Sequence, residues 1–133
     1  MFQIRILYAE DYDLVLFTVK QLLELEGWAV DISRDGAAAL KLIESNIEYD
    51  LLLLDEDMPV IRGVELVRRA RALPHRRETP IIIFTASDCG AEALASGADA
   101  CLIKPSGLRD LIRTIEELID RQSPPLRISN HGT

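Results

Sequence analysis

The feature that most restricts the fold is a run of four leucines, residues 51–54, which ends directly at Asp55. A wholly apolar run of this length, followed by Pro59 and Gly63, is typical of a strand that is buried on both faces of a parallel sheet. Open α/β sheets bind their ligands beyond the carboxyl ends of such strands. Asp55 is therefore a candidate site residue.

Short apolar runs and stretches of helical periodicity alternate along the chain. The runs predict strands at residues 4–9, 28–33, 51–54, 81–84 and 100–103. The segments between and after them predict helices at residues 12–26, 35–46, 64–72, 90–96 and from 108 onward. Five β-α units predict an α/β fold, a doubly wound five-stranded parallel sheet with helices on both faces.

The chain has 133 residues, which is the size of one domain that buries about two-thirds of its unfolded surface. Cys89 and Cys101 have neither the spacing of metal ligands nor that of a redox pair. No leader-like segment precedes the first strand, and no apolar run approaches the length of a membrane span. We therefore expect a cytoplasmic protein without membrane insertion.

The net charge of −7 and the pI of about 4.8 argue against nucleic-acid binding by this domain. One cluster is basic nevertheless: Arg68, Arg69, Arg71, His75, Arg76 and Arg77. Such a cluster could bind an acidic partner, but the solvated carboxyl end of a helix also favours cations. We favour the second interpretation.

Polar side chains follow four of the predicted strands: Glu10 and Asp11, then Asp55, Thr85 and Lys104. The carboxyl ends of parallel strands share one edge, so these groups should converge. Three crowded carboxylates favour a bound divalent cation. Because the donors are hard oxygens, with no thiolate or imidazole nearby in sequence, Mg²⁺ or Mn²⁺ fits better than zinc.

These residue types suit phosphoryl transfer, which depends mainly on positioning and on charge stabilisation. Lys104 would neutralise a phosphoryl group, and Thr85 would donate a hydrogen bond to it. A carboxylate can act as the nucleophile. Asp55, which is central in the set, is the natural choice.

From residue 2 to about residue 122 the chain resembles the receiver domain of bacterial two-component response regulators, of the chemotaxis-regulator type. The resemblance rests on the following residues, in this order: Glu10-Asp11, Asp55, Met58-Pro59, Gly63, Thr85-Ala86 and Lys104-Pro105. It implies a flavodoxin-like (βα)5 sheet with strand order 2-1-3-4-5. It also implies a receiver domain over residues 1–122, followed by a flexible tail or linker stub over residues 123–133.

The resemblance further implies a signalling domain rather than an enzyme. Asp55 would accept a phosphoryl group from a sensor histidine kinase or a phosphotransfer protein. No output domain is expected to follow the receiver, so the phosphorylated form would act in trans on an unknown downstream protein, and a homodimer is a further expectation.

Specific roles follow for the site residues. Asp11 and Asp55 would bind Mg²⁺ directly, Glu10 would assist through water, and the backbone carbonyl of Asp57 would complete the protein ligands. Three further residues would surround the phosphoryl group: Thr85 and Lys104 as donors to its oxygens, and Ala86 as the small residue that leaves room for it.

Two features depart from the family pattern. Cys101 stands three residues before Lys104, where the family usually carries a Tyr or Phe that swings inward on activation. Only nineteen positions separate Thr85 from Lys104, about one helical turn fewer than is usual, which predicts a truncated fourth helix. Both changes fall on the usual output face, so we expect intact phosphorylation chemistry and an altered signalling surface.

Two smaller features belong to the same region. The side chain of Asp57 could be a second metal-facing carboxylate, or it could point to solvent, where it would tune hydrolysis of the acyl phosphate. Ser87 would tune the same rate or cap the short helix. Cys101 is expected to be a small buried strand residue, and Trp28 a packing residue.

Three alternatives remain open. A degenerate receiver could serve as a phosphorylation-independent interaction module, although Asp55, Thr85 and Lys104 are all present. Residues 55–57 also resemble the nucleophile motif of haloacid-dehalogenase-type phosphatases, but that motif usually lies on the first strand. Finally, acidic strand ends can simply form caps and solvated turns, which would leave Thr85 and Lys104 unexplained.

Overall fold

Five parallel strands run in the order β2-β1-β3-β4-β5 in a computed structural model of the chain, which describes residues 3–88 and 90–122. The strands are β1 (Arg5–Ala9), β2 (Ala29–Ser33), β3 (Leu51–Leu54), β4 (Ile81–Thr85) and β5 (Ala100–Ile103). The helices are α1 (Asp13–Leu25), α2 (Gly36–Glu44), α3 (Gly63–Arg71), α4 (Gly90–Ser96) and α5 (Leu108–Arg121), with a short 3-10 turn, η1 (Pro74–Arg76). The predicted fold class and strand order are confirmed. Cys89 and the predicted tail, residues 123–133, lie outside the described residues.

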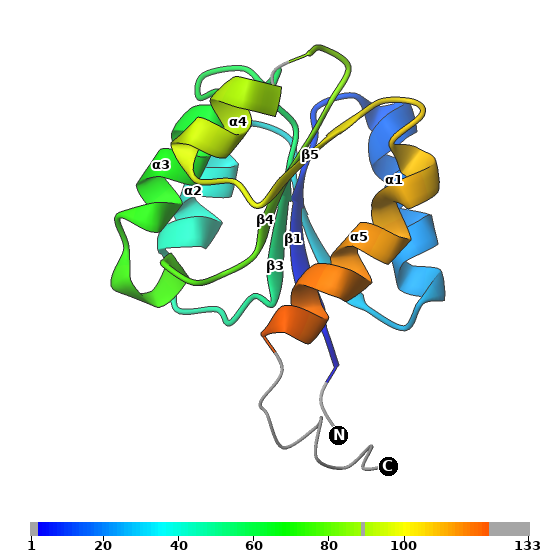
Figure 1. Ribbon diagram of the computed structural model, residues 1–133, viewed down its shortest axis with the longest axis horizontal. Coiled ribbons are helices and arrows are strands. Elements are labelled where there is room, and N and C mark those ends of the chain that lie inside the picture. The colour runs from blue at the N-terminus through cyan, green and yellow to red at the C-terminus, as the bar shows by residue number, and fades with distance from the viewer. Residues whose placement is uncertain (1–2, 89, 123–133) are drawn as a thin grey trace.

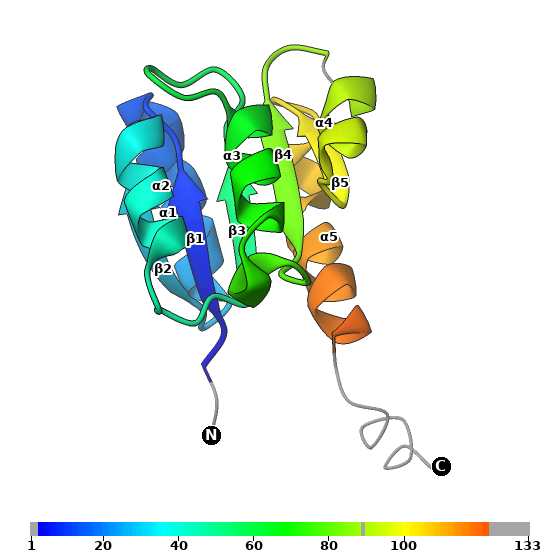
Figure 2. The ribbon, with the colours of Figure 1, turned by 90° about the vertical axis from the view of Figure 1, so that its left-hand side faces the viewer.

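The helices form two layers, with α1 and α5 on one face of the sheet and α2, α3 and α4 on the other (Figure 1). The same arrangement is visible from the side in Figure 2. Alternate strand residues point to opposite faces, so Leu52 and Leu54 pack toward α2–α4 while Leu51 and Leu53 pack toward α1 and α5. All four leucines are completely buried, as the sequence predicts.

The outer helices turn one apolar stripe to the sheet. In α5 the buried residues are Leu111, Ile115 and Leu118. In α1 the buried residues are Leu16, Val19 and Leu23, and Val15 is partly buried. Of the helices in the described part of the chain, none combines the length and hydropathy that crossing a membrane requires.

The basic cluster is not solvated throughout, so the prediction of a solvated helix end is wrong for part of it. Arg76 is only 2% exposed, and its guanidinium donates to the carbonyl oxygens of Leu42, Ile43 and Ser45 at the end of α2. The last carbonyls of a helix have no partner within the helix, and the five donors of an arginine suit them. Arg76, from a distant part of the sequence, thus caps the C-terminal end of α2.

Arg71 is also engaged rather than solvated. Its guanidinium donates to the carbonyl oxygens of Thr79 and Gly97, and it pairs with Asp99 at 3.0 Å. It further donates to the carbonyl oxygens of Arg76 and Arg77. The prediction of solvated side chains holds for the exposed residues of the cluster. Arg68 and Arg69, for example, are exposed and pair with Glu65 on the outer surface of α3.

Candidate functional site

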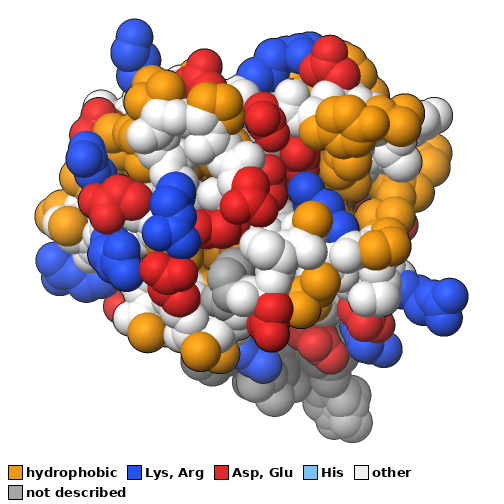
Figure 3. Space-filling view, turned by 90° about the horizontal axis from the view of Figure 1, so that it is seen from above, with side chains coloured by type: hydrophobic (Ala, Val, Ile, Leu, Met, Phe, Trp, Pro, Cys, Tyr) orange, Lys and Arg blue, Asp and Glu red, His pale blue; other side chains and the backbone are white. Residues whose placement is uncertain are grey.

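The predicted polar residues meet at the carboxyl edge of the sheet, at the top of Figure 1. Glu10, Asp11 and Asp55 each place one carboxylate oxygen within 4.8 Å of the others. Thr85 ends β4, and Lys104 follows β5 directly. Seen from above, acidic side chains gather near the middle of this edge with basic side chains beside them (Figure 3).

The three carboxylates differ in their access to solvent. Glu10 is 1% exposed and Asp55 is 4% exposed, whereas Asp11 is exposed at the mouth of the site. The sheet therefore holds two acidic groups in a largely dehydrated position. The exposed third group keeps one side of the cluster in contact with solvent.

Lys104 is the cation that offsets these buried charges. Its Nζ lies 2.5 Å from Glu10 Oε1 and 3.5 Å from Asp55 Oδ1. The ammonium also lies 5.3 Å from the centroid of the Phe84 ring, which favours a cation at its face. In this structure the Lys104 ammonium is therefore closer to Glu10 than to Asp55.

The surroundings of Asp55 disfavour its charged form. Its burial, followed by the charge of Glu10, raises the pKa of its carboxyl to about 6, although Lys104 acts in the opposite direction. A divalent cation would relieve this repulsion, and the oxygen-only donor set suits Mg²⁺. The residues present thus fit the metal that the sequence predicts.

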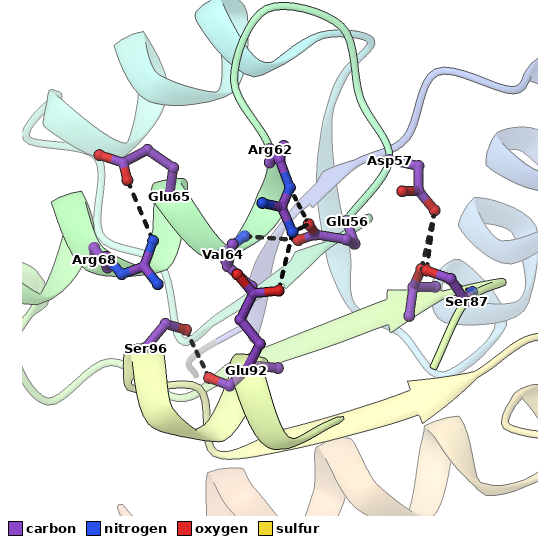
Figure 4. A network of polar contacts seen from close by, with 11 residues as sticks. Glu56, Asp57, Arg62, Val64, Glu65, Arg68, Ser87, Glu92 and Ser96 are labelled. Carbon is purple, nitrogen blue, oxygen red and sulfur yellow. Dashed lines mark hydrogen bonds and ion pairs between the residues drawn. The ribbon is translucent and has the colours of Figure 1, made fainter. Parts of the chain in front are cut away.

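Asp57 is exposed, as predicted, but its carboxylate also accepts hydrogen bonds from within the protein. Its Oδ2 accepts hydrogen bonds from Thr85 Oγ1 at 3.3 Å and from Ser87 Oγ at 3.4 Å (Figure 4). Ser87 also donates its backbone N–H to Thr85 Oγ1 at 3.2 Å. The three polar side chains form a closed group, which we name the Asp57 clasp, and Ala86 lies exposed within the same turn.

Glu56 is a buried residue of this region to which the sequence analysis assigned no role. It is 2% exposed; its Oε1 accepts the backbone N–H of Val64 at 2.9 Å, and its Oε2 accepts from Arg62. Arg62 also pairs with Glu92 on α4 at 3.0 Å, as Figure 4 shows. The sequence does contain a signal for this role. Arg62 at the N-cap of α3 has no side-chain acceptor for the first N–H groups of the helix, so another residue has to supply one.

The loop between β3 and α3 depends on a glycine that the sequence analysis marked. A Cβ atom at Gly63 would lie 2.6 Å from the carbonyl oxygen of Asp55. The absence of a side chain lets the Gly63 N–H donate to Glu56 O at 3.1 Å. Gly63 thus allows the loop to fold back against the site.

The same loop contains a strained residue. Val60 has a φ of 75° and is 82% exposed, and the N–H of Ile61 donates to Pro59 O across it at 2.9 Å. A three-residue turn with positive φ is rare, and a β-branched residue is unfavourable in it. The N–H of Gly36 holds the turn from the other side by donating to the same carbonyl at 3.2 Å.

The structure shows both features in which the sequence departs from the family pattern, the short fourth helix and Cys101. α4 has seven residues, which confirms the predicted truncation. Cys101 lies on β5, partly rather than fully buried, and packs against the core on the α2–α4 side. Trp28 packs, also partly buried, against the opposite core, as predicted.

An apolar cavity of about 140 Å³ opens beside Lys104, between α1 and α5. Leu14, Pro105 and Leu108 are among its lining residues. Leu14 is 68% exposed, and Phe17 is also exposed on α1. Apolar surface therefore adjoins the charged edge.

Three comparisons with known proteins place the chain among others. The profile of the response regulator receiver domain matches residues 6–116. Response regulator MprA of Mycobacterium sp. (strain KMS) is 35% identical over 124 residues, which are 91% of this chain and 53% of MprA. The chain thus spans about half the length of the curated relatives it matches.

Two solved structures are similar throughout. The CheY-like response regulator receiver domain protein from Methanospirillum hungatei JF-1 has a TM-score of 0.83 and 34% identity, covering 91% of this chain and 97% of that one. The receiver domain of the sensor histidine kinase PA1611 from Pseudomonas aeruginosa PAO1 has a TM-score of 0.81 and 29% identity, covering 90% and 99%. That structure holds a magnesium ion in its active site cleft.

Proposed function

The chain belongs to the response regulator receiver domain family, and on that premise we propose that it is a phosphorylation-controlled switch whose phosphoacceptor is Asp55. The observation that carries the proposal is the position of Asp55 at the end of β3. There its carboxylate lies 3.5 Å from Lys104 and within a few ångströms of two further carboxylates. The perturbed pKa of Asp55 further supports a functional site.

Mg²⁺ is the cofactor that this site would bind. Asp11 and Asp55 would be direct ligands, Glu10 would act through water, and the backbone carbonyl of Asp57 would add a fourth protein group. When bound, the ion supplies the positive charge that lets these carboxylates ionise together and that offsets charge on a phosphoryl group. Mn²⁺ could take the same role.

The chain's own residues would carry the transfer as follows. A carboxylate oxygen of Asp55 forms a bond to phosphorus while the bond from phosphorus to the imidazole nitrogen of a phosphohistidine breaks. The imidazole leaves with the bonding electron pair and takes up a proton from solvent. Lys104 and Thr85 donate hydrogen bonds to the phosphoryl oxygens, and Ala86 leaves room for them.

The conformational response would begin at Thr85. To reach a phosphoryl group, its hydroxyl must leave the Asp57 clasp, because one hydroxyl proton cannot serve both acceptors. The turn after β4 then follows and alters the surface formed by α4, β5 and α5. This is a shift between two packings caused by a local change of charge.

A sensor histidine kinase or a phosphotransfer protein is the proposed donor. Such a partner must bring its phosphohistidine to the carboxyl edge, where Leu14 and Pro105 present apolar surface next to Lys104. A downstream protein or a second copy of the chain would bind the surface formed by α4, β5 and α5. The identity of the downstream partner is left open.

Intact mass measurement after incubation with acetyl phosphate and Mg²⁺ tests the proposal, with Asp55→Asn as control. One metal-dependent phosphoryl adduct that is missing from the control is the expected result. Absence of an adduct from the wild-type protein, with Mg²⁺ binding confirmed by calorimetry, would reject Asp55 as a working phosphoacceptor. If Mg²⁺ does not bind either, the proposed metal site fails as well.

A second candidate function is that of a phosphorylation-independent interaction module. The seven-residue α4 and Cys101 on β5 favour it, because both alter the surface through which the switch would signal. Partner binding that is equal in wild type and in Asp55→Asn would support this second function. Binding that requires Asp55 and a phosphoryl donor would support the first.

A further inference from the structure

Arg62 joins the loop beside the proposed phosphoacceptor to α4. Its guanidinium donates to Oε2 of Glu56, the residue that follows Asp55, and it pairs with Glu92 in the first turn of α4 at 3.0 Å (Figure 4). Glu92 is the only charged residue of α4. The ion pair therefore links two segments that lie 30 positions apart in the sequence.

The two halves of this bridge differ in how easily they can open. Glu56 is 2% exposed and also accepts the backbone N–H of Val64, so the fold keeps its carboxylate in place. Because a buried carboxylate that loses its cation is costly, Arg62 should stay with Glu56. The side chain of Glu92 is 44% exposed, and water can solvate its charge once the pair separates. Arg62 is thus the fixed arm of the bridge, and Glu92 is the partner that can be released.

The helix α4 has little apolar contact to fix its position. Of its seven residues, all of which the structure describes, Ala93 alone is buried, and Leu94 is 55% exposed. A helix of this length is not stable by itself in water, so its position depends on its contacts with the rest of the protein. An ion pair in its first turn can therefore bias where the helix lies.

The first turn of α4 is also the part of the helix that a displacement of Thr85 reaches first. The helix begins at Gly90, a few positions after Thr85. In the proposed function Thr85 leaves the Asp57 clasp to bind a phosphoryl group, and the turn after β4 moves with it. That movement would carry Glu92 away from Arg62.

We propose that the Arg62–Glu92 ion pair is a latch, which holds the first turn of α4 in the unphosphorylated protein and opens when Asp55 carries a phosphoryl group. The inference rests on the proposed function, because binding at Asp55 is what opens the latch. The latch adds to the cost of switching that the Asp57 clasp imposes. Both of its side chains are exposed, so salt weakens the pair and switching becomes easier as ionic strength rises.

Glu92→Ala tests the inference, with Glu65→Ala as the matched control. Glu65 also lies in the first turn of a helix, its side chain is also 44% exposed, and it also pairs with arginines. Those arginines lie on the same helix, α3, so the loss of Glu65 breaks no link between two elements. Hydrogen exchange measured by mass spectrometry reports on α4 in the ligand-free protein. Calorimetry in the presence of Mg²⁺ measures the affinity for beryllium trifluoride, an analogue of the bound phosphoryl group.

In Glu92→Ala the amides of α4 should exchange about two- to five-fold faster than in the wild type, because the first turn is released. Beryllium trifluoride should bind about two- to five-fold more tightly, because its binding no longer has to open an ion pair. Glu65→Ala should show neither change. In about 1 M NaCl the wild type and Glu92→Ala should become alike, because salt screens pairs of exposed charges.

A double-mutant cycle with Arg62→Ala assigns the effect to the pair. In the Arg62→Ala background, Glu92→Ala should change neither the exchange of α4 nor the affinity, because the latch is already absent. An undiminished effect in that background would assign it to the lost negative charge alone and would overturn the latch. If a thermal melt shows that Arg62→Ala is unfolded, the exchange of α4 in the single variant makes the same distinction, since a charge effect on anion binding leaves the ligand-free helix unchanged.

The outcomes separate the latch from the proposed function. If the wild type binds beryllium trifluoride and Glu92→Ala matches it in affinity and in exchange, the latch is overturned while the proposed function stands. Faster exchange with unchanged affinity also overturns the latch, because the pair then holds α4 equally in both states. If the wild type binds Mg²⁺ but not beryllium trifluoride, the proposed function fails and the latch fails with it.

Discussion

The carboxylate of Asp57 accepts a hydrogen bond from Thr85 Oγ1 at 3.3 Å, so the hydroxyl proposed to bind a phosphoryl group is already held by a neighbour. Ser87 closes the clasp from the other side, at 3.1 Å from the same hydroxyl oxygen. Binding a phosphoryl group therefore competes with an existing interaction. The strength of that interaction sets part of the equilibrium between the two states of the switch.

Asp57→Ala should free the Thr85 hydroxyl. We expect beryllium trifluoride, in the presence of Mg²⁺, to bind about three- to ten-fold more tightly, because a hydrogen bond to a charged acceptor no longer has to be broken. The backbone carbonyl proposed as a metal ligand is unchanged by this substitution. Calorimetry measures the affinity.

Asp57→Asn is the control that separates the hydrogen bond from the charge. Its side-chain oxygen can still accept from Thr85, while the negative charge that repels anions is gone. Equal gains in the Ala and Asn variants would assign the effect to charge. No gain in either variant would show that the clasp does not oppose the switch.

Asp55→Asn should stabilise the metal-free protein at neutral pH. Burial and the charge of Glu10 raise the pKa of Asp55 from 3.8 to about 6, so the folded state holds this proton more tightly than the unfolded state does. The carboxyl therefore lowers stability as pH rises from about 4 to about 6, and the full loss is present at pH 7. We expect Asn to recover about 1–3 kcal/mol at pH 7.

Urea unfolding in EDTA at a series of pH values measures this difference. The gap between the variant and wild type should narrow as pH falls from 6 toward 4, and Mg²⁺ should narrow it at pH 7 by stabilising wild type alone. A variant that is less stable than wild type at pH 7 without metal would contradict the buried-charge account of Asp55.

Glu56→Ala should be strongly destabilising. The substitution leaves the N–H of Val64 without its acceptor at the start of α3, which should cost about 2–3 kcal/mol. Glu56→Gln should cost less, since its amide oxygen can accept the same N–H. Chemical denaturation measures both variants.

Glu65→Ala provides the comparison for Glu56. Glu65 also pairs with arginines, but on the exposed surface of α3, where ion pairs contribute little. Its loss should cost less than about 0.5 kcal/mol. Similar losses for the two alanine variants would mean that Glu56 acts only as a surface ion-pair partner.

Val60→Asn should raise stability, because asparagine tolerates positive φ better than a β-branched residue does. Val60 is mostly exposed, so little packing is lost. We expect a gain of about 0.5–1.5 kcal/mol in urea unfolding. Val60→Thr retains the branched Cβ and should show no such gain; an equal gain from threonine would assign the effect to surface polarity instead.

Sequence reasoning predicted the parts that depend on local pattern. The leucine strand, the alternation of strands and helices, and the meeting of Glu10, Asp11 and Asp55 all follow from periodicity and from the shared edge of a parallel sheet. The strand order came from the family resemblance. The phosphatase alternative loses its support, since residues 55–57 follow β3 in a receiver domain.

The residues that sequence reasoning missed are those whose partners lie far away in the chain or depend on loop geometry. Arg76 is buried because it reaches the carbonyls at the end of α2, more than 30 positions earlier. Glu56 is buried because α3 starts without a capping side chain. The contact between Asp57 and Thr85 depends on how two loops meet, which no periodicity encodes.

Arg71 adds a mechanical consequence to the fold. Its guanidinium donates to the carbonyl oxygen of Thr79, just before β4. It also donates to Gly97 O and to Asp99 Oδ2, in the turn that follows α4. The stretch that contains Thr85 and α4 is therefore tethered at both of its ends to a single point on the amino side of the sheet. A displacement that starts at Thr85 should leave the contacts of Arg71 in place. We therefore expect α4 to rotate about its last turn rather than to translate as a whole.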